Sequence, residues 1–256
     1  MIVDQTSWGA VRVTGGDRVR FLQGMCMGDV AKVSAGAWLR TATLNAKGRL
    51  LSIYDLMARD EELLLLCQPG LAEATRALLE RHAIADDVTF DLVEDLAVHR
   101  VWDTPEAVWS APPVFAPPPG EPASAEEVET RRIEAGLPLY GVDVGDDSFP
   151  FETPLARLID YGKGCYLGQE PVARVKARGT PSRLLRGLRF ADGGAVARGA
   201  AIHHPARSDA GHVTSSALSP AFGPIALGFL ARQAWEPGGE VEVAGRRAIV
   251  VEPPFR

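Results

Sequence analysis

The chain has 256 residues, of which 46% are hydrophobic and 23% charged, and its formal net charge at pH 7 is −6. These proportions are typical of a soluble globular protein with one large domain or a few small ones. The acidic balance argues against direct nucleic-acid binding, because affinity for the phosphate backbone depends on clustered Lys and Arg.

Strand patterns alternate with two helix patterns over the first hundred residues. Alternation of apolar and polar residues, together with one short apolar run, predicts strands over 8–14, 38–44, 49–57, 63–67, 88–93 and 96–102. The second and third of these form a hairpin with its turn at 45–48. We expect one helix after the glycine turn at 15–17 and another from Pro69-Gly70 to about His82.

The middle and the end of the chain differ in pattern. Residues 104–122 are rich in proline, which is typical of a linker or surface loop. A short charged helix is expected over 126–135, ending at Gly136. Short strand patterns between Gly and Pro turns then predict a small barrel-like β domain from five segments: 184–190, 211–215, 225–230, 240–243 and 248–252.

Residues 169–178 have the marks of another short helix. Pro171 would lie near its start, an acidic residue in its first turn and a glycine just past its end. The alternative is a strand with its basic residues, Arg174, Lys176 and Arg178, on one face. The position of the proline and the order of the charges favour the helix.

Three widely spaced cysteines, Cys26, Cys67 and Cys165, suggest free thiols in a reducing compartment. The first residues lack a secretory signal and no stretch approaches the roughly 20 apolar residues that cross a bilayer, so we expect a cytoplasmic protein with no membrane partner. We expect Cys26 and Cys67 in the core. Three thiols are too few for a typical four-cysteine iron–sulfur or zinc site, and we expect no metal site.

Residues 163–170 read Lys-Gly-Cys-Tyr-Leu-Gly-Gln-Glu and are the most informative stretch of the chain. The thiol of Cys165 is surrounded by flexible, charged and hydrogen-bonding residues: Lys163, Gly164, Gly168, Gln169 and Glu170. The charge of Lys163 could favour the thiolate of Cys165. We therefore interpret Cys165 as a functional thiol. The alternative is a small buried hydrophobe, which is the usual role of a free cysteine.

Two further clusters of polar residues favour ordinary surface roles. His203, His204, Asp209 and His212 match no standard metal-ligand spacing, and solvated histidines in a loop explain them better. By composition, Arg131, Arg132 and Glu134 are best explained as a solvated helix face. Phosphate-binding glycine loops and the Gly-x-Ser-x-Gly elbow are absent from the sequence.

Together with Arg174 downstream, residues 163–170 resemble the signature of the YgfZ family. These are folate-binding proteins related to the glycine cleavage T-protein and to iron–sulfur assembly factors. The similarity spans essentially the whole chain, in four further stretches: 8–30, 44–49, 132–141 and 211–228.

The resemblance implies an α+β, T-protein-like fold of several domains around a central channel, with a small C-terminal β-barrel. It implies a discontinuous folate-binding domain (residues 1–40 plus 100–180), an inserted α+β domain (41–99) and the barrel domain (181–256). Tetrahydrofolate, or a one-carbon derivative of it, would bind in the channel.

The resemblance also assigns roles to single residues. Trp8, Glu134 and Tyr166 would contact the folate, since a carboxylate such as Glu134 can accept paired N–H donors from an aminopterin edge. Cys165 would lie near the folate as the catalytic thiol, supported by the rest of the 163–170 motif and by Arg174.

The chain departs from the family pattern in three places. Met27-Gly28 replaces Thr-Asn before Asp29. Glu127 and Val128 stand where some members have a second tryptophan. No counterpart of the T-protein's catalytic aspartate is evident, since Asp86 and Asp87 are expected to be structural.

By resemblance, the protein would act in iron–sulfur cluster biosynthesis or repair, with iron–sulfur enzymes as its partners, including a tRNA-modifying one. Whether it is an enzyme, such as a folate-dependent transferase, is left open. One alternative is an aminomethyltransferase-like one-carbon transfer enzyme, which the missing aspartate disfavours. The other is a non-catalytic docking or scaffold module.

Overall fold

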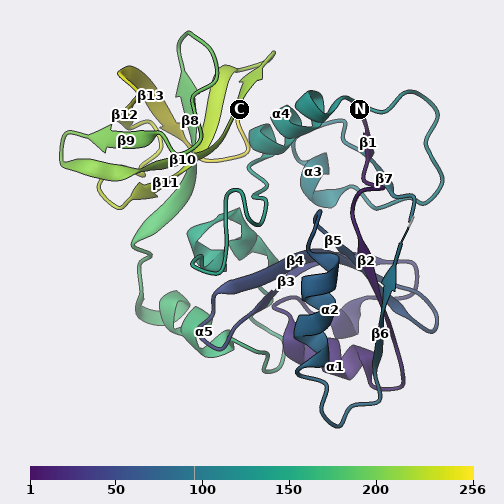
Figure 1. Ribbon diagram of the computed structural model, residues 1–256. Coiled ribbons are helices and arrows are strands. Elements are labelled where there is room, and N and C mark those ends of the chain that lie inside the picture. Colours follow the sequence, from purple (N-terminus) through teal and green to yellow (C-terminus); the bar gives the residue numbers. More distant parts are fainter. Residues whose placement is uncertain (95) are drawn as a thin grey trace.

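Five antiparallel strands form a sheet in the first hundred residues of the structure, a computed structural model that describes residues 1–94 and 96–256 (Figure 1). In spatial order they are β3 (Trp38–Leu44), β4 (Leu50–Ala58), β5 (Leu63–Cys67), β2 (Ala10–Thr14) and β6 (Thr89–Val93). The predicted β3–β4 hairpin is confirmed, with Gly48 of its turn at φ 77°. Only glycine adopts this conformation without strain.

Two helices, both predicted from the sequence, cover one side of this sheet. They are α1 (Arg18–Met25) and α2 (Ala72–Glu80). Leu22 of α1 and Leu79 of α2 are fully buried in one cluster with apolar strand residues such as Leu65. The helices are short, so burial of this apolar face, rather than helix propensity, supplies most of their stability.

A second, two-stranded sheet joins the N-terminus to the middle of the chain. β1 (Ile2–Asp4) pairs with β7 (His99–Val101), which is shorter than the strand predicted over 96–102. The prediction of a plain linker over 104–122 is wrong in part, because α3 (Ala107–Ser110) lies within it. Val108 is fully buried and Trp109 Nε1 donates to Ala135 O at 2.9 Å, so apolar contacts order this segment despite its prolines.

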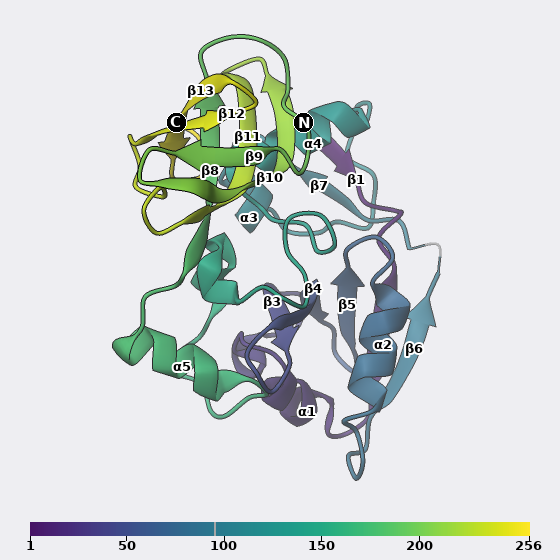
Figure 2. The same cartoon turned by 60° about the vertical axis from the view of Figure 1, so that its left-hand side comes forward.

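The C-terminal third is a closed barrel of six antiparallel strands, which confirms the predicted barrel (Figure 2). In spatial order they are β10 (Arg207–Ser219), β11 (Gly223–Ala231), β8 (Arg183–Phe190), β13 (Arg246–Val251), β12 (Glu240–Val243) and β9 (Ala201–His204). Sequence analysis missed β9, because its histidines suggested a loop. Pairing of β9 with β10 and β12 closes the barrel and places His203 and His204 on a strand.

Two further helices lie between β7 and β8 in the chain. α4 (Ala125–Ala135) ends at Gly136, as predicted, and lies beside the barrel. α5 (Gln169–Arg178) is a helix rather than a strand, which also agrees with the prediction; the side chain of Arg178 lies outside the described part. Two short 3-10 turns, Pro150–Glu152 and Pro154–Leu158, lie between them.

The predicted division into domains stays a prediction. Its boundary between residues 40 and 41 falls inside β3, and β2 hydrogen-bonds to both β5 and β6. Within the residues that the structure describes, no helix has the length and apolar character needed to cross a membrane.

One buried carboxylate links the two sheets. Asp55 on β4 accepts from Arg40 Nε at 2.7 Å and from Arg100 Nη2 at 2.5 Å, and all three residues are at most 4% exposed. Arg40 also donates to the carbonyl of Val108 at 2.9 Å, and Arg100 to Gln5 Oε1 at 2.8 Å. Burial alone would raise the pKa of Asp55, but the charges of the two arginines outweigh it and lower that pKa.

Asp55→Asn removes the charge that neutralises two buried guanidinium groups. We expect the free energy of unfolding to fall by about 3–5 kcal/mol. In the native chain, the stabilisation from Asp55 is present above its ordinary pKa of 3.8 and is lost as pH falls through the lowered folded value. Urea unfolding as a function of pH measures both effects. Asp60→Asn at an exposed position is the control and should change stability by less than about 0.5 kcal/mol.

Candidate functional site

The lysine of the 163–170 motif stabilises the end of α1. Lys163 is buried, and its Nζ donates to the carbonyls of Gln23 at 2.7 Å, Cys26 at 2.6 Å and Gly28 at 2.7 Å. The last carbonyls of a helix lack intrahelical partners and attract a cation. Burial lowers the pKa of Lys163. The motif is thereby fixed to a helix more than 130 positions earlier in the chain.

Cys165 is exposed, whereas Cys26 and Cys67 are buried in the core as predicted. An ammonium group has three N–H donors, and Lys163 uses all three on backbone carbonyls. Lys163 therefore has no hydrogen bond left for the Cys165 thiolate. No hydrogen bond from Lys163 to Cys165 therefore supports the hypothesis, drawn from the sequence, that Lys163 activates this thiol.

The two glycines of the motif have different roles. Gly168 has φ 80°, and an added Cβ would lie 2.4 Å from the Asn45 carbonyl oxygen and 2.9 Å from Leu44 Cβ. It permits close packing of the motif on the β3–β4 turn. Gly164 has an ordinary φ, and an added Cβ there would meet nothing within 4 Å, so its special flexibility is not used.

The remaining motif residues divide between the core and the surface. Tyr166 is 7% exposed within the main hydrophobic core, where burial raises its pKa to about 12. Gln169 is half-buried, while Glu170 and Arg174 are exposed on α5. Folate contact by Tyr166, and support of a site by the other three, stay predictions.

Gly168→Ala should lower the free energy of unfolding by about 2–4 kcal/mol, because it combines a left-handed backbone with a collision against the Asn45 carbonyl. Gly164→Ala is the matched variant and should change stability by less than about 0.5 kcal/mol. Urea unfolding of both proteins measures the difference. Equal losses would show that the packing of the motif on the hairpin turn is not the reason for its second glycine.

Trp8 lies at a hollow of about 420 Å³ beside α4, here called the Trp8 hollow. The residues that line it come from the N-terminal segment, the turn before α2, the residue that follows β7, and α4 with the segments on either side of it. Those used below are Trp8, Trp102, Val128, Glu129 and Arg132. The backbone N–H of Trp8 donates to the carbonyl of Gln5 at 2.8 Å. Because Gln5 is itself buried and bonded to Arg100, Trp8 is positioned by the buried ion cluster.

Arg132 is buried at the base of this hollow, so the interpretation of a solvated helix face is wrong. Its five N–H groups are all used. Nε and Nη2 donate to the two oxygens of Glu129 at 2.7 and 2.5 Å, and Nη1 donates to Asp143 at 2.7 Å. The remaining two reach the Leu137 carbonyl and Ser215 Oγ. Composition could not reveal this burial, because the barrel strand that covers Arg132 lies more than 80 residues away in sequence.

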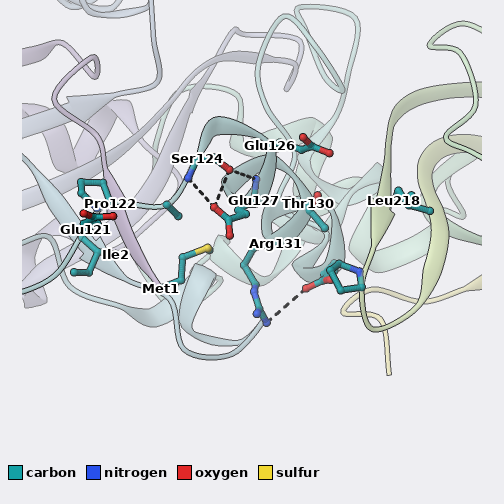
Figure 3. A pocket seen from close by; sticks show the side chains of 13 residues that line it. Met1, Ile2, Glu121, Pro122, Ser124, Glu126, Glu127, Thr130, Arg131 and Leu218 are labelled. Carbon is teal, nitrogen blue, oxygen red and sulfur yellow. Dashed lines mark hydrogen bonds and ion pairs between the residues drawn. The ribbon is translucent and has the colours of Figure 1, made fainter.

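Glu134 lines a different hollow, of about 610 Å³. Figure 3 shows this hollow, with Thr130 and Arg131 of α4 along it. Its carboxylate accepts from Ser219 Oγ at 2.6 Å and lies 3.5 Å from Arg131 Nη1. Ser219 in turn accepts from the backbone N–H of Phe222, so Glu134 ties α4 to the β10–β11 turn. Figure 3 also shows the capping box at the start of α4, between Ser124 and the side chain of Glu127. The structure therefore does not bring Trp8 and Glu134 into one hollow.

The Trp8 hollow has the properties expected of a site for a flat, partly polar organic molecule. Its volume lies in the range of small-molecule sites, and Trp8 is half-buried. Trp102 also lines it, and the buried Nε1 of Trp102 has no hydrogen-bond partner in residues 1–94 and 96–256. A buried donor of this kind is uncommon. Cys165 is not among the described residues that line this hollow.

Sequence analysis missed Trp102, Glu129 and Arg132 as residues of this hollow. The spacing of Val128, Glu129 and Arg132 does place them on one face of α4, and this signal was available. No local signal marks Trp102, because its place depends on the pairing of β1 with β7. For metals, the described part of the chain shows no group of three or more His, Cys, Asp or Glu that could hold an ion.

The barrel matches a known family model, that of the glycine cleavage T-protein C-terminal barrel domain, over residues 183–255. An aminomethyltransferase of Moorella thermoacetica is 39% identical over 139 residues, which cover 52% of this chain and 37% of that protein. The "tRNA-modifying protein YgfZ" of Yersinia enterocolitica is 26% identical over 229 residues, covering 72% of this chain and 69% of that protein. The match thus spans well under two thirds of that aminomethyltransferase.

The fold as a whole matches the crystal structure of the glycine cleavage system aminomethyltransferase T from Bartonella henselae. The TM-score is 0.82 at 21% identity, covering 100% of this chain and 86% of that one. The predicted T-protein-like α+β fold is thereby confirmed. The barrel thus matches the T-protein barrel family, and the chain is similar in sequence to aminomethyltransferases and to YgfZ proteins.

Proposed function

We propose that this protein binds tetrahydrofolate, or a one-carbon derivative, in the Trp8 hollow and acts in iron–sulfur cluster biosynthesis or repair with Cys165 as its functional thiol. The observation that carries the proposal is that Trp8 and Val128 line the same hollow. The resemblance associates Trp8 with folate, and Val128 stands in the region where some family members have a second tryptophan. The similarity to YgfZ proteins over 72% of the chain and the 163–170 motif support this branch of the superfamily.

The residues of the hollow suit a folate. Trp8 offers an aromatic face for a pterin ring. Glu129 adds a carboxylate. A bound tetrahydrofolate would supply the capacity to carry a one-carbon unit. The protein's own contribution is to bind the ring, orient it and exclude water from part of it.

Cys165 is the thiol available to a partner, because Cys26 and Cys67 are buried. It could act as a nucleophile, as a transient ligand of a cluster in transit, or as a docking residue for a client enzyme. A single cysteine can hold a cluster only with ligands from a second chain or a small thiol. The clients proposed are iron–sulfur enzymes, including a tRNA-modifying one.

An aminomethyltransferase is the second candidate, favoured by the 39% identity to such an enzyme. Asp86 and Asp87, the two residues that could replace the missing aspartate, offer this candidate little support. Asp87 accepts from the backbone N–H of Gly16 at 2.9 Å, and Asp86 pairs with Arg20 at 2.6 Å. Asp87 therefore holds the turn before α1, and Asp86 pairs with α1 itself. Formation of methylenetetrahydrofolate from an aminomethyl-lipoyl protein would establish this activity directly.

Trp8→Ala should weaken tetrahydrofolate binding by about 1–2 kcal/mol, roughly 5- to 30-fold, through loss of an aromatic stacking surface. Trp8→Phe should retain most of the affinity. Isothermal titration calorimetry of both variants measures the effect. Glu134→Gln in the same titration tests the contact implied by the resemblance. A loss at Glu134 with none at Trp8 would move the proposed site to the hollow of Figure 3.

Cys165→Ser should abolish the cellular function and leave the fold intact, because the side chain is exposed. The readout is the activity of iron–sulfur enzymes in cells that carry only the variant. Its free energy of unfolding should stay within about 0.5 kcal/mol of the parent protein. Normal iron–sulfur enzyme activity in these cells would remove Cys165 from the proposal and leave folate binding untouched.

A further inference from the structure

Helix α5 follows the exposed thiol of Cys165 and presents basic residues to solvent. Residues 163–178 contain four basic residues and one acidic residue, in a chain whose formal net charge is −6. Figure 2 shows α5 at the edge of the molecule, beside the β3–β4 hairpin and below the barrel. Val172 anchors α5 in the main hydrophobic core, whereas Arg174 and Lys176 are exposed. The outer side of α5 is therefore open to another molecule.

Three cations of this surface lack an acidic partner. The side chains of Lys47, Arg174 and Lys176 are exposed and form no ion pair with any residue in the described ranges, 1–94 and 96–256. Lys47 belongs to the surface because its turn packs on the start of α5, where an added Cβ at Gly48 would lie 3.0 Å from Pro171 Cβ. Cations gathered without counter-charges make the local potential positive, which attracts an acidic partner.

A hollow of about 510 Å³, here called the Tyr161 hollow, adjoins this surface. The ring of Tyr161 is 45% exposed and lines the hollow, and its centroid lies 3.4 Å from Lys176 Nζ, so the hollow and α5 share a rim. Trp38, Leu39 and Leu158 also line the hollow, and each is half-buried. Such a concave group of apolar side chains is typical of the pocket that holds an anchor residue in a protein interface.

The charged residues of the Tyr161 hollow largely balance one another. Asp29 and Asp160 line it, and both pair with Lys32, at 2.8 and 3.2 Å. The guanidinium of Arg157 also lines it and lies 4.8 Å from the centroid of a Trp109 ring. The excess positive charge therefore belongs to α5 and the hairpin turn, and the hollow itself suits an uncharged side chain.

We propose that Cys165, the three cations Lys47, Arg174 and Lys176, and the Tyr161 hollow form a docking surface for an acidic segment of a partner protein, which places one apolar side chain in the hollow. The inference deepens the proposed function and rests on it in one respect, since it takes this partner to be the client that meets Cys165. Charges at the rim of an interface act chiefly on the rate of association, and an apolar anchor contributes much of the affinity.

The rate of thiol–disulfide exchange at Cys165 measures the charge preference. Two short peptide probes each carry one cysteine as a mixed disulfide with thionitrobenzoate, flanked by glutamates in one probe and by lysines in the other. The Cys165 thiolate attacks the peptide sulfur, a protein–peptide disulfide forms, and coloured thionitrobenzoate leaves with the electron pair of the broken bond. Cys26 and Cys67 are buried, and Cys165→Ser gives the background rate. The ratio of the two rates cancels the intrinsic reactivity of the thiol.

The net charge of −6 by itself favours the lysine probe, whereas a local basic surface reverses this order. At an ionic strength of about 0.1 M, where charges act over about 10 Å, the glutamate probe should react roughly 3- to 10-fold faster. The double variant Arg174→Gln, Lys176→Gln should reduce this ratio to about twofold or less. Arg81→Gln, Arg232→Gln makes the same change in net charge at exposed positions after α2 and β11, and should keep the parent ratio.

Two further measurements extend the test. In the parent protein the preference should disappear at about 1 M ionic strength, where charges are screened within about 3 Å, and this result needs no variant. A glutamate probe with a phenylalanine beside its cysteine should react faster than the same probe with alanine there. Tyr161→Ala should remove that difference, because it removes part of the wall of the hollow.

Equal rates for the two probes, or a faster lysine probe, would overturn the inference and leave the proposed function untouched. A single-stranded oligonucleotide that slows the glutamate probe at a lower concentration than a cysteine-free glutamate peptide of equal charge would assign the surface to a phosphate backbone and also overturn it. A glutamate preference together with normal iron–sulfur enzyme activity in Cys165→Ser cells would support the docking surface and remove Cys165 from the proposed function.

Discussion

The guanidinium of Arg132 joins the parts of the molecule that surround the Trp8 hollow. Its five N–H groups reach Glu129 on its own helix, Leu137 and Asp143 on the following loop, and Ser215 on the barrel. Asp143 also accepts the hydroxyls of Thr214 and Ser215, so the loop and the barrel strand share one acceptor. A buried charge is tolerated only when its partners are complete, and here every donor has one. The relative placement of α4 and the barrel follows from this network.

Lys163 likewise joins segments that are distant in the sequence. Its ammonium group joins the 163–170 motif to the carbonyls at the end of α1, and Gly168 allows the motif to contact the β3–β4 turn. The lysine and the second glycine of the motif are therefore explained by packing. What packing does not explain is Cys165, which is exposed.

Much of the fold was predictable from local patterns. The β3–β4 hairpin, α2 and α5 follow from turn residues and apolar spacing, and these signals are contained within each segment. β9 escaped prediction because a four-residue strand with two histidines has almost no pattern of its own, and its identity depends on two partners far along the chain. The burial of Arg132 and Glu134 escaped for the same reason: the barrel that covers them is distant in sequence.

Some residues of the candidate site were likewise predictable from the sequence and others were not. The motif and Trp8 were identified from residue order, whereas Trp102 and Glu129 became visible only once β1, β7 and α4 were placed together. Predictions from residue types succeed where one segment carries the whole signal. They fail where a site is assembled from several segments.

The separation of the Trp8 hollow from Cys165 bears on how the thiol could act. Cys165 does not line that hollow, and Lys163 has no free donor for it. A nucleophilic cysteine needs a neighbouring base or a cation that stabilises its thiolate. An exposed thiol whose nearest motif cation is already committed is better suited to a role in which a partner brings the missing groups. Such a partner could be a client protein that supplies further cluster ligands, or a small thiol. Under the proposed function, the surface around Cys165, rather than the Trp8 hollow, is then the place where a client would be recognised.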